Sequence, residues 1–96
     1  MKIVWTETAV ADLEAIHSFI ARDSEYYASV FISEILNAVT KLENFPRSGR
    51  MVPEVNDNDI RELILGNYRL IYQIEKSQIQ ILTVLHGAGN MQGFEY

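Results

Sequence analysis

The spacing of apolar residues changes halfway along the chain, and this change constrains the fold more than any other feature. From Val10 to Leu42, apolar residues recur at steps of three and four, which places them on one face of a helix. After residue 59, apolar residues occupy every second position, a pattern typical of β-strands. Residues 46–59 lie between the two patterns and contain both prolines and an Asn/Asp cluster, which indicate a loop.

The helical half divides into two helices. Thr6 can cap a helix at residues 7–22, and Asp23 or Ser24 can cap a second helix at residues 25–44. The short connection predicts a helical hairpin. The second helix must end before the proline at position 46, because a residue that precedes proline avoids the helical region.

The second half predicts strands at residues 60–65, 68–75 and 79–86, joined by turns at residues 66–67 and 76–77. A short strand at residues 2–5 precedes the helices. The fold class is therefore α+β: a short N-terminal strand, a helical hairpin and a three-stranded antiparallel meander, with the helices on one face of the sheet. We expect a single domain spanning residues 1–96, with residues 87–96 as a flexible tail and with Phe31 and Leu70 in the core.

The last predicted strand is apolar on both faces. Strict alternation places Leu82 and Val84 on one face, and Ile79, Ile81 and Leu85 on the other. Because the two helices can cover only one face, we expect the other to be an uncovered, partner-binding surface formed by Leu82 and Val84 or by the opposite set.

The charge distribution limits the kinds of partner. The chain has eight basic and thirteen acidic residues, a net charge of −5, whereas proteins that hold nucleic acid by its phosphates are usually basic. Four of the five arginines lie after residue 46, so an anionic or acidic partner should bind there. These candidate partner-binding arginines are Arg47, Arg50, Arg61 and Arg69.

Several classes of site and location are disfavoured by composition. With two histidines and no cysteine, we expect neither a metal site nor another cofactor. No apolar run reaches the ~20 residues that a membrane span needs. The N-terminus lacks the pattern of a signal peptide, so we expect a cytoplasmic protein without membrane contact.

Four segments in order resemble the ParE branch of the RelE/ParE toxin superfamily. They are IVWTETAVADLEAIHSFI, LENFPRSGRMVPE, IRELILGNYRLIYQIE and IQILTVLHG, which together run from about residue 2 to residue 88. The resemblance implies a toxin that a cognate antitoxin protein neutralises. The chain could form a homodimer by itself or a hetero-oligomer with the antitoxin. In the superfamily, the ParE branch is linked to inhibition of DNA gyrase, and the RelE branch cuts messenger RNA on the ribosome.

The resemblance also implies candidate catalytic residues. Arg69 matches the strand arginine that steadies the scissile phosphate in nuclease members, and Arg61 matches a position that opens the preceding strand. Glu54 lies where some nuclease members carry a general base. His86 ends the last strand, where a histidine could act as general acid because its pKa lies near neutrality.

Each of these residues also has a structural interpretation. Arg69 could form an ion pair with Glu62 or Glu75, Arg61 could form a surface ion pair, and Glu54 could be an ordinary loop acid. Gly89 stands where many relatives have arginine, which weakens the case for a nuclease.

We therefore predict a toxin of a type II toxin–antitoxin system that acts by binding a protein target such as DNA gyrase. Two alternatives stay open. The first is a metal-independent endoribonuclease that acts on messenger RNA at the ribosome, and the second is a degenerate, non-toxic module that binds an antitoxin.

Overall fold

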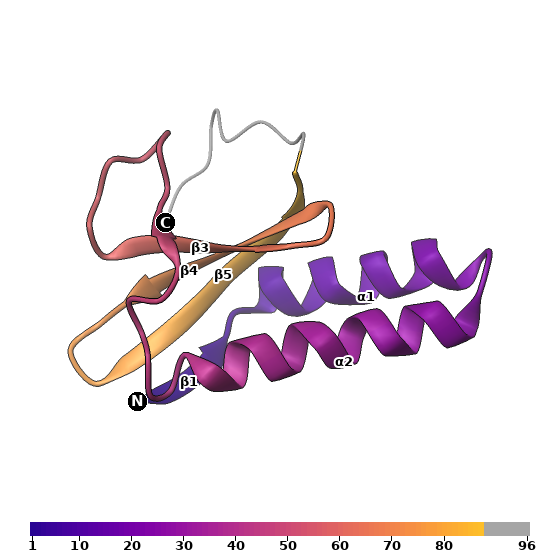
Figure 1. Ribbon diagram of the computed structural model, residues 1–96, viewed down its shortest axis with the longest axis horizontal. Helices are drawn as coiled ribbons and strands as arrows, with labels where there is room; N and C mark the ends of the chain where they lie inside the picture. The colour runs from indigo at the N-terminus through magenta and orange to yellow at the C-terminus, as the bar shows by residue number, and fades with distance from the viewer. Residues whose placement is uncertain (88–96) are drawn as a thin grey trace.

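The computed structural model describes residues 1–87 and consists of a five-stranded sheet with two helices packed on one of its faces (Figure 1). The α+β fold predicted from the sequence is confirmed. In chain order the elements are β1 (Lys2–Trp5), α1 (Glu7–Ala21), α2 (Glu25–Lys41), β2 (Arg50–Met51), β3 (Ile60–Leu65), β4 (Tyr68–Ile74) and β5 (Gln78–His86).

Both helices begin at the predicted caps. The Thr6 hydroxyl accepts a hydrogen bond from the Ala9 amide at 3.1 Å, and the Ser24 hydroxyl accepts one from the Tyr27 amide at 3.2 Å. Each cap satisfies an amide that would otherwise lack a partner in the first turn of its helix. The helices lie side by side as a hairpin beneath the sheet (Figure 1).

The sheet extends beyond the predicted meander at both edges. Strands β3, β4 and β5 form the antiparallel meander, while β1 pairs in parallel with β5 and β2 pairs with β3, giving the order β1-β5-β4-β3-β2. The β3–β4 turn depends on Gly66, whose φ of +59° lies in the left-handed region that glycine adopts without strain.

The main core lies between the helices and the sheet. Leu70 is fully buried there, as predicted, whereas Phe31 is only partly buried and packs against Tyr68, with 5.4 Å between the ring centroids. The buried members are Ala9, Ile16, Ile35, Val39, Leu42, Leu70, Tyr72, Ile74, Ile79, Ile81 and Val84.

The second face of the sheet is not bare, and this corrects the expectation of an uncovered surface. The loop between β2 and β3 folds over it on the side away from the helices (Figure 1). Val52 in this loop is fully buried against Ile60 of β3 and Ile71 of β4. A long loop can cover a sheet face when it contributes its own apolar side chains, as Val52 does here.

A β-bulge in β5 makes strict alternation wrong in that strand. The register steps from Ile71 opposite Thr83 to Tyr72 opposite Ile81, which leaves Leu82 as the additional residue. Val84 consequently joins the core between the helices and the sheet, while Leu82 packs on the second face. The predicted pairing of Leu82 with Val84 on one partner-binding surface is therefore wrong, since Val84 is only 4% exposed.

The bulge also turns Leu85 to the second face, next to the loop cluster. Asp12 of α1 fixes the bulge, because its carboxylate accepts hydrogen bonds from the Thr83 hydroxyl and from the Val84 amide, the latter at 3.0 Å. No helix within residues 1–87 is long and apolar enough to cross a membrane. The predicted flexible tail, apart from residue 87, lies outside the described residues.

Candidate functional site

Residues 46–59 form one long loop that includes the short strand β2 and ends at β3, and the buried hydroxyl of Tyr72 holds its first part. This hydroxyl donates a hydrogen bond to the Pro46 carbonyl at 2.7 Å and accepts one from the Gly49 amide at 3.0 Å. The tyrosine ring belongs to the main core, and burial raises the pKa of the hydroxyl. One side chain therefore connects the core to the start of the loop.

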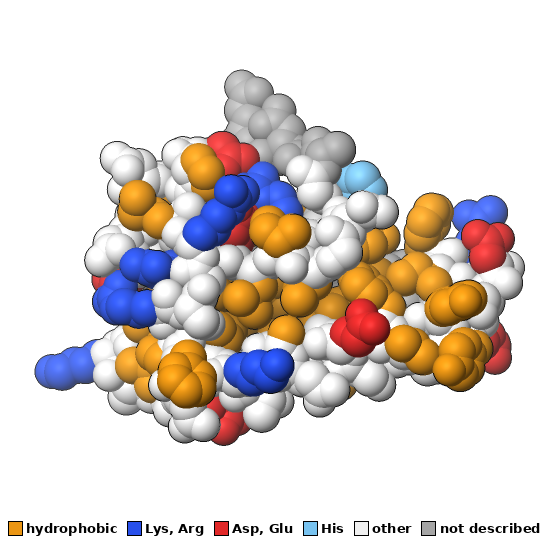
Figure 2. Space-filling model, in the orientation of Figure 1, with side chains coloured by type: hydrophobic (Ala, Val, Ile, Leu, Met, Phe, Trp, Pro, Cys, Tyr) orange, Lys and Arg blue, Asp and Glu red, His pale blue; other side chains and the backbone are white. Residues whose placement is uncertain are grey.

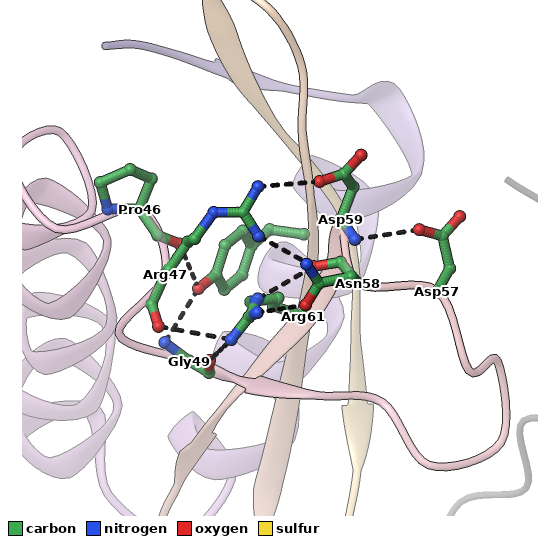
Figure 3. A network of polar contacts seen from close by, with 8 residues as sticks. Pro46, Arg47, Gly49, Asp57, Asn58, Asp59 and Arg61 are labelled. Carbon is green, nitrogen blue, oxygen red and sulfur yellow. Dashed lines mark hydrogen bonds and ion pairs between the residues drawn. The ribbon is translucent and has the colours of Figure 1, made fainter.

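Arg61 holds the same loop from β3. Its guanidinium donates to the Gly49 carbonyl at 2.9 Å, to the Asn58 carbonyl at 3.0 Å and to the Asn58 side-chain oxygen at 2.6 Å. Figure 3 shows Arg61 between these two parts of the loop, with Arg47 reaching across to Asp59. Arg61 thus connects the beginning and the end of the loop.

Arg61 does not share a face with Arg69. Arg61 lies opposite Tyr72 in the β3–β4 pair, whereas Arg69 lies opposite Ile64. Directly paired residues share a face and successive residues alternate. The side chains of the two arginines therefore project from opposite faces of the sheet. Arg61 forms hydrogen bonds with the loop instead of joining Arg69.

Close packing explains why the segment FPRSGR has a glycine at position 49. A Cβ atom at this position would lie 2.6 Å from the Glu62 carbonyl oxygen and 2.6 Å from the Tyr72 hydroxyl oxygen. Such distances are too short for any side chain, so only glycine allows the loop to approach this closely. The approach brings the next residue, Arg50, over β3.

A buried carboxylate, Glu62, organises the charged residues on this face. Its side chain is fully buried and accepts hydrogen bonds from the Nε atoms of Arg50 and Arg69. The Arg69–Glu62 distance is 2.6 Å. A buried carboxylate needs such partners, because an unpaired charge in the interior is strongly destabilising. Of the two partners that the sequence suggested for Arg69, Glu62 and Glu75, the structure pairs it with Glu62, and the pair is buried.

Glu54 binds the outer edge of the Arg69 guanidinium. The two terminal nitrogens donate to the two carboxylate oxygens of Glu54 at 2.8 and 2.9 Å, a bidentate arrangement. Hydrogen bonding by Arg69 lowers the pKa of Glu54 from 4.5 to about 2, and hydrogen bonding by Glu54 raises the pKa of Arg69. Glu54 is therefore a very weak base in this state.

His86 lies at the edge of the same region but on the other face of the sheet. It is paired with Tyr68 across β4 and β5, and the two rings pack edge to face with centroids 5.6 Å apart. Arg69 is paired with Leu85 instead. The side chains of Arg69 and His86 therefore project from opposite faces of the sheet, near the end of β4 and β5.

These residues surround a cleft of about 470 Å³ beside the β3–β4 turn, lined by Arg50, Glu54, Ile64, Tyr68, Arg69 and His86 among others. The lining holds two arginines and one carboxylate, that of Glu54. Arg50 and Arg69 are matched by Glu54 and by the adjacent buried Glu62, so the ion pairs leave no net charge. The two terminal nitrogens of Arg69 can donate hydrogen bonds to another oxyanion only if Glu54 is displaced.

The other candidate residues lie apart from this cleft. Arg47 forms an ion pair with Asp59 at 3.0 Å, and Leu82 packs under the loop. Figure 2 shows most basic side chains over the sheet and loop, and a band of apolar side chains between the sheet and the helices. Within residues 1–87, no three histidine or acidic side chains are grouped as metal ligands would be.

Sequence reasoning underrated two residues of this site, Glu62 and Tyr72. Glu62 lies between Ile60 and Ile64 at alternating positions, so a charged residue faces the same side as two apolar ones. That pattern is the signal of a buried, paired carboxylate. The alternating pattern of β4 indicates only that Tyr72 packs in the core, and its contacts with the loop depend on a turn that sequence spacing does not specify.

The sequence matches the family described as "ParE toxin of type II toxin-antitoxin system, parDE" over residues 3–91. A protein named as a candidate toxin, Y4kP of Sinorhizobium fredii, is 33% identical over 87 residues, covering 88% of this chain and 86% of that protein. Toxin RelE2 of Caulobacter vibrioides is 28% identical over 88 residues, covering 91% and 96%.

Two solved structures share the fold. One is described as the chromosomal ParDE toxin–antitoxin system from P. aeruginosa, with a TM-score of 0.74, 25% identity and coverage of 90% of this chain and 95% of that chain. The other is the toxin–antitoxin complex RelBE2 from Mycobacterium tuberculosis, with a TM-score of 0.61, 23% identity and coverage of 88% and 95%. The second likeness concerns the fold alone.

Proposed function

Since the chain belongs to the ParE toxin family of type II toxin–antitoxin systems, we propose that it inhibits growth by binding a protein target. DNA gyrase is the target that its resemblance to the ParE branch favours. We also propose that a cognate antitoxin protein binds the chain and neutralises it. A similar solved structure supports an antitoxin, because it is described as a toxin–antitoxin system.

The observation that carries this proposal is the engagement of Arg69 by Glu54 and Glu62. A nuclease would need this guanidinium to hold a phosphate and a nearby acid to protonate the leaving oxygen. Here Arg69 is 6% exposed and fully paired, and His86 leaves the opposite face of the sheet. The net charge of −5 further opposes binding to phosphate-rich RNA. A protein target is compatible with all three features.

One observation favours the ribosome-dependent endoribonuclease as a second candidate. Glu54, Arg69 and His86 line one cleft, and these are the residue types that general acid–base cleavage of RNA requires. Cleavage would require Glu54 to release Arg69 and to regain basicity, since its pKa is about 2 when paired.

Expression in bacteria, with and without a gene for a cognate antitoxin, tests the proposal. We expect growth arrest that the antitoxin gene prevents, inhibition of gyrase-dependent supercoiling by the purified chain, and no cuts in primer extension on a translated messenger. The variant His86→Ala should arrest growth as the wild type does. Codon-phased cuts that disappear in His86→Ala would contradict the proposal and favour the nuclease. Normal growth would favour the non-toxic module.

A further inference from the structure

The four charged residues of the cleft differ greatly in how they are held. The side chains of Glu62 and Arg69 are 0% and 8% exposed, whereas those of Glu54 and Arg50 are 43% and 61% exposed. Removing Glu62 from its partners would leave a buried charge, which is costly. Glu54 can turn into water without burying or stranding its own charge. Of the two carboxylates, Glu54 is therefore the exchangeable one.

The contact that Glu54 makes has the form of a ligand contact. Two parallel hydrogen bonds join the guanidinium nitrogens of Arg69 to one carboxylate, at 2.8 and 2.9 Å. Any carboxylate from another molecule could reproduce this geometry, because the fork of arginine recognises the carboxylate group itself. The third donor of Arg69, its Nε, stays engaged by Glu62 and holds the guanidinium in position.

We propose that Arg69 is a carboxylate receptor that the chain keeps occupied with its own Glu54, and that a protein partner binds by placing an acidic side chain in its stead. The inference rests on the proposed function, because it assigns a binding contact to a toxin that acts on proteins. The loop would then act as a competitor that weak or non-specific anions cannot displace.

The surroundings favour an acidic protein segment over a nucleic acid. Ile64 lies directly opposite Arg69 on the same face of the sheet, and its side chain is 54% exposed. An exposed apolar side chain beside a charged site is typical of protein interfaces, and an acidic residue next to an apolar one would fit Arg69 and Ile64 together. In Figure 2, basic, acidic and apolar side chains lie next to one another above the sheet.

The test is a titration of the purified chain with a short neutral peptide that contains one Ile-Glu pair, followed by the NMR signals of the Arg69 guanidinium. Glu54→Gln removes the internal competitor, so we expect the peptide to bind at least about tenfold more tightly than to the wild type, because an intramolecular ligand has a high effective concentration. The same peptide with Ile-Gln should not bind.

Asp59→Asn is the matched control, since it removes one negative charge from the same loop without a contact to Arg69. An equal gain in affinity in Asp59→Asn would reveal a general charge effect and overturn the proposal, as would unchanged affinity in Glu54→Gln. In Glu54→Gln/Arg69→Lys the gain should disappear. If that variant does not fold, the Asp59→Asn and Ile-Gln comparisons still decide.

A second titration uses a short single-stranded RNA. Tighter binding of the RNA than of the acidic peptide to Glu54→Gln would also overturn the proposal. Because the titration does not depend on toxicity, its result is separable from the growth assay. A tenfold gain in a chain that fails to arrest growth would support the carboxylate receptor and contradict only the proposed toxicity.

Discussion

Replacing Tyr72 with phenylalanine removes one oxygen atom that connects the core to the loop. The ring is fully buried and would stay in place, but the Pro46 carbonyl would lose its donor and the Gly49 amide its acceptor. A hydrogen bond contributes about 1 kcal/mol net, and an unsatisfied buried group costs more. For two bonds we expect Tyr72→Phe to lower the free energy of unfolding by about 2 kcal/mol, a large share for a small domain.

Urea unfolding measures this change. With an m-value of about 2 kcal/mol per M, the midpoint should fall by about 1 M. Tyr26→Phe is the control, because it removes the same atom from a side chain that is 74% exposed, and its midpoint should be unchanged. A loss below about 0.5 kcal/mol in Tyr72→Phe would refute the reasoning that the hydroxyl holds the loop.

The same variant should also differ from the wild type in how its free energy of unfolding changes at high pH. Burial raises the pKa of Tyr72 in the folded chain above the unfolded value of about 10. The folded chain therefore holds this proton more tightly, so the contribution to stability is complete below pH ~10 and is lost as the pH rises further. The wild type should lose more stability than Tyr72→Phe above that pH, and parallel curves would contradict this.

Two further predictions concern the ion cluster and the core. The pKa of Glu54 is about 2 when folded against 4.5 normally, so its contribution is present above pH ~4.5 and is lost as the pH falls toward 2. Thermal melts of Glu54→Gln should therefore show a shallower acid loss, by at most about 1 kcal/mol because the carboxylate is partly solvated, and equal slopes would argue against it. Leu70→Ala should cost about 2–5 kcal/mol in urea, whereas Leu36→Ala, at a site 44% exposed, should cost much less. Similar losses would mean that Leu70 is not in a packed core.

The sequence predicted the elements whose signals are local. The helices follow from apolar spacing and from the caps at Thr6 and Ser24, and the β3–β4 hairpin follows from Gly66. The two residues of β2 and the parallel pairing of β1 have no such signal, because they are set by distant contacts. The bulge at Leu82 depends on Asp12, which is far away in the chain and fixes it through the Val84 amide.

Individual residues of the site could be predicted from the sequence, but their arrangement around the cleft could not. Arg69, Glu54 and His86 were identified by resemblance, but their relations depend on strand register and on where the loop lies. Register decides that Arg61 faces away from Arg69. The loop decides that Glu54 reaches Arg69, and it is positioned by Tyr72, whose contacts with Pro46 and Gly49 could not be inferred from spacing.

The parallel pairing of β1 with β5 has a consequence for synthesis of the chain. Lys2 pairs with Gln78, and the Thr6 hydroxyl and amide both donate to the Ile81 carbonyl, so β1 contacts a strand that is made more than 70 residues later. During translation, the N-terminal segment must remain without its neighbour until residue 81 has left the ribosome. Contacts of such long sequence separation also slow folding. A nascent chain therefore cannot complete its sheet early. A newly made chain passes through an interval in which the edge of β5 that pairs with β1 still lacks its neighbouring strand.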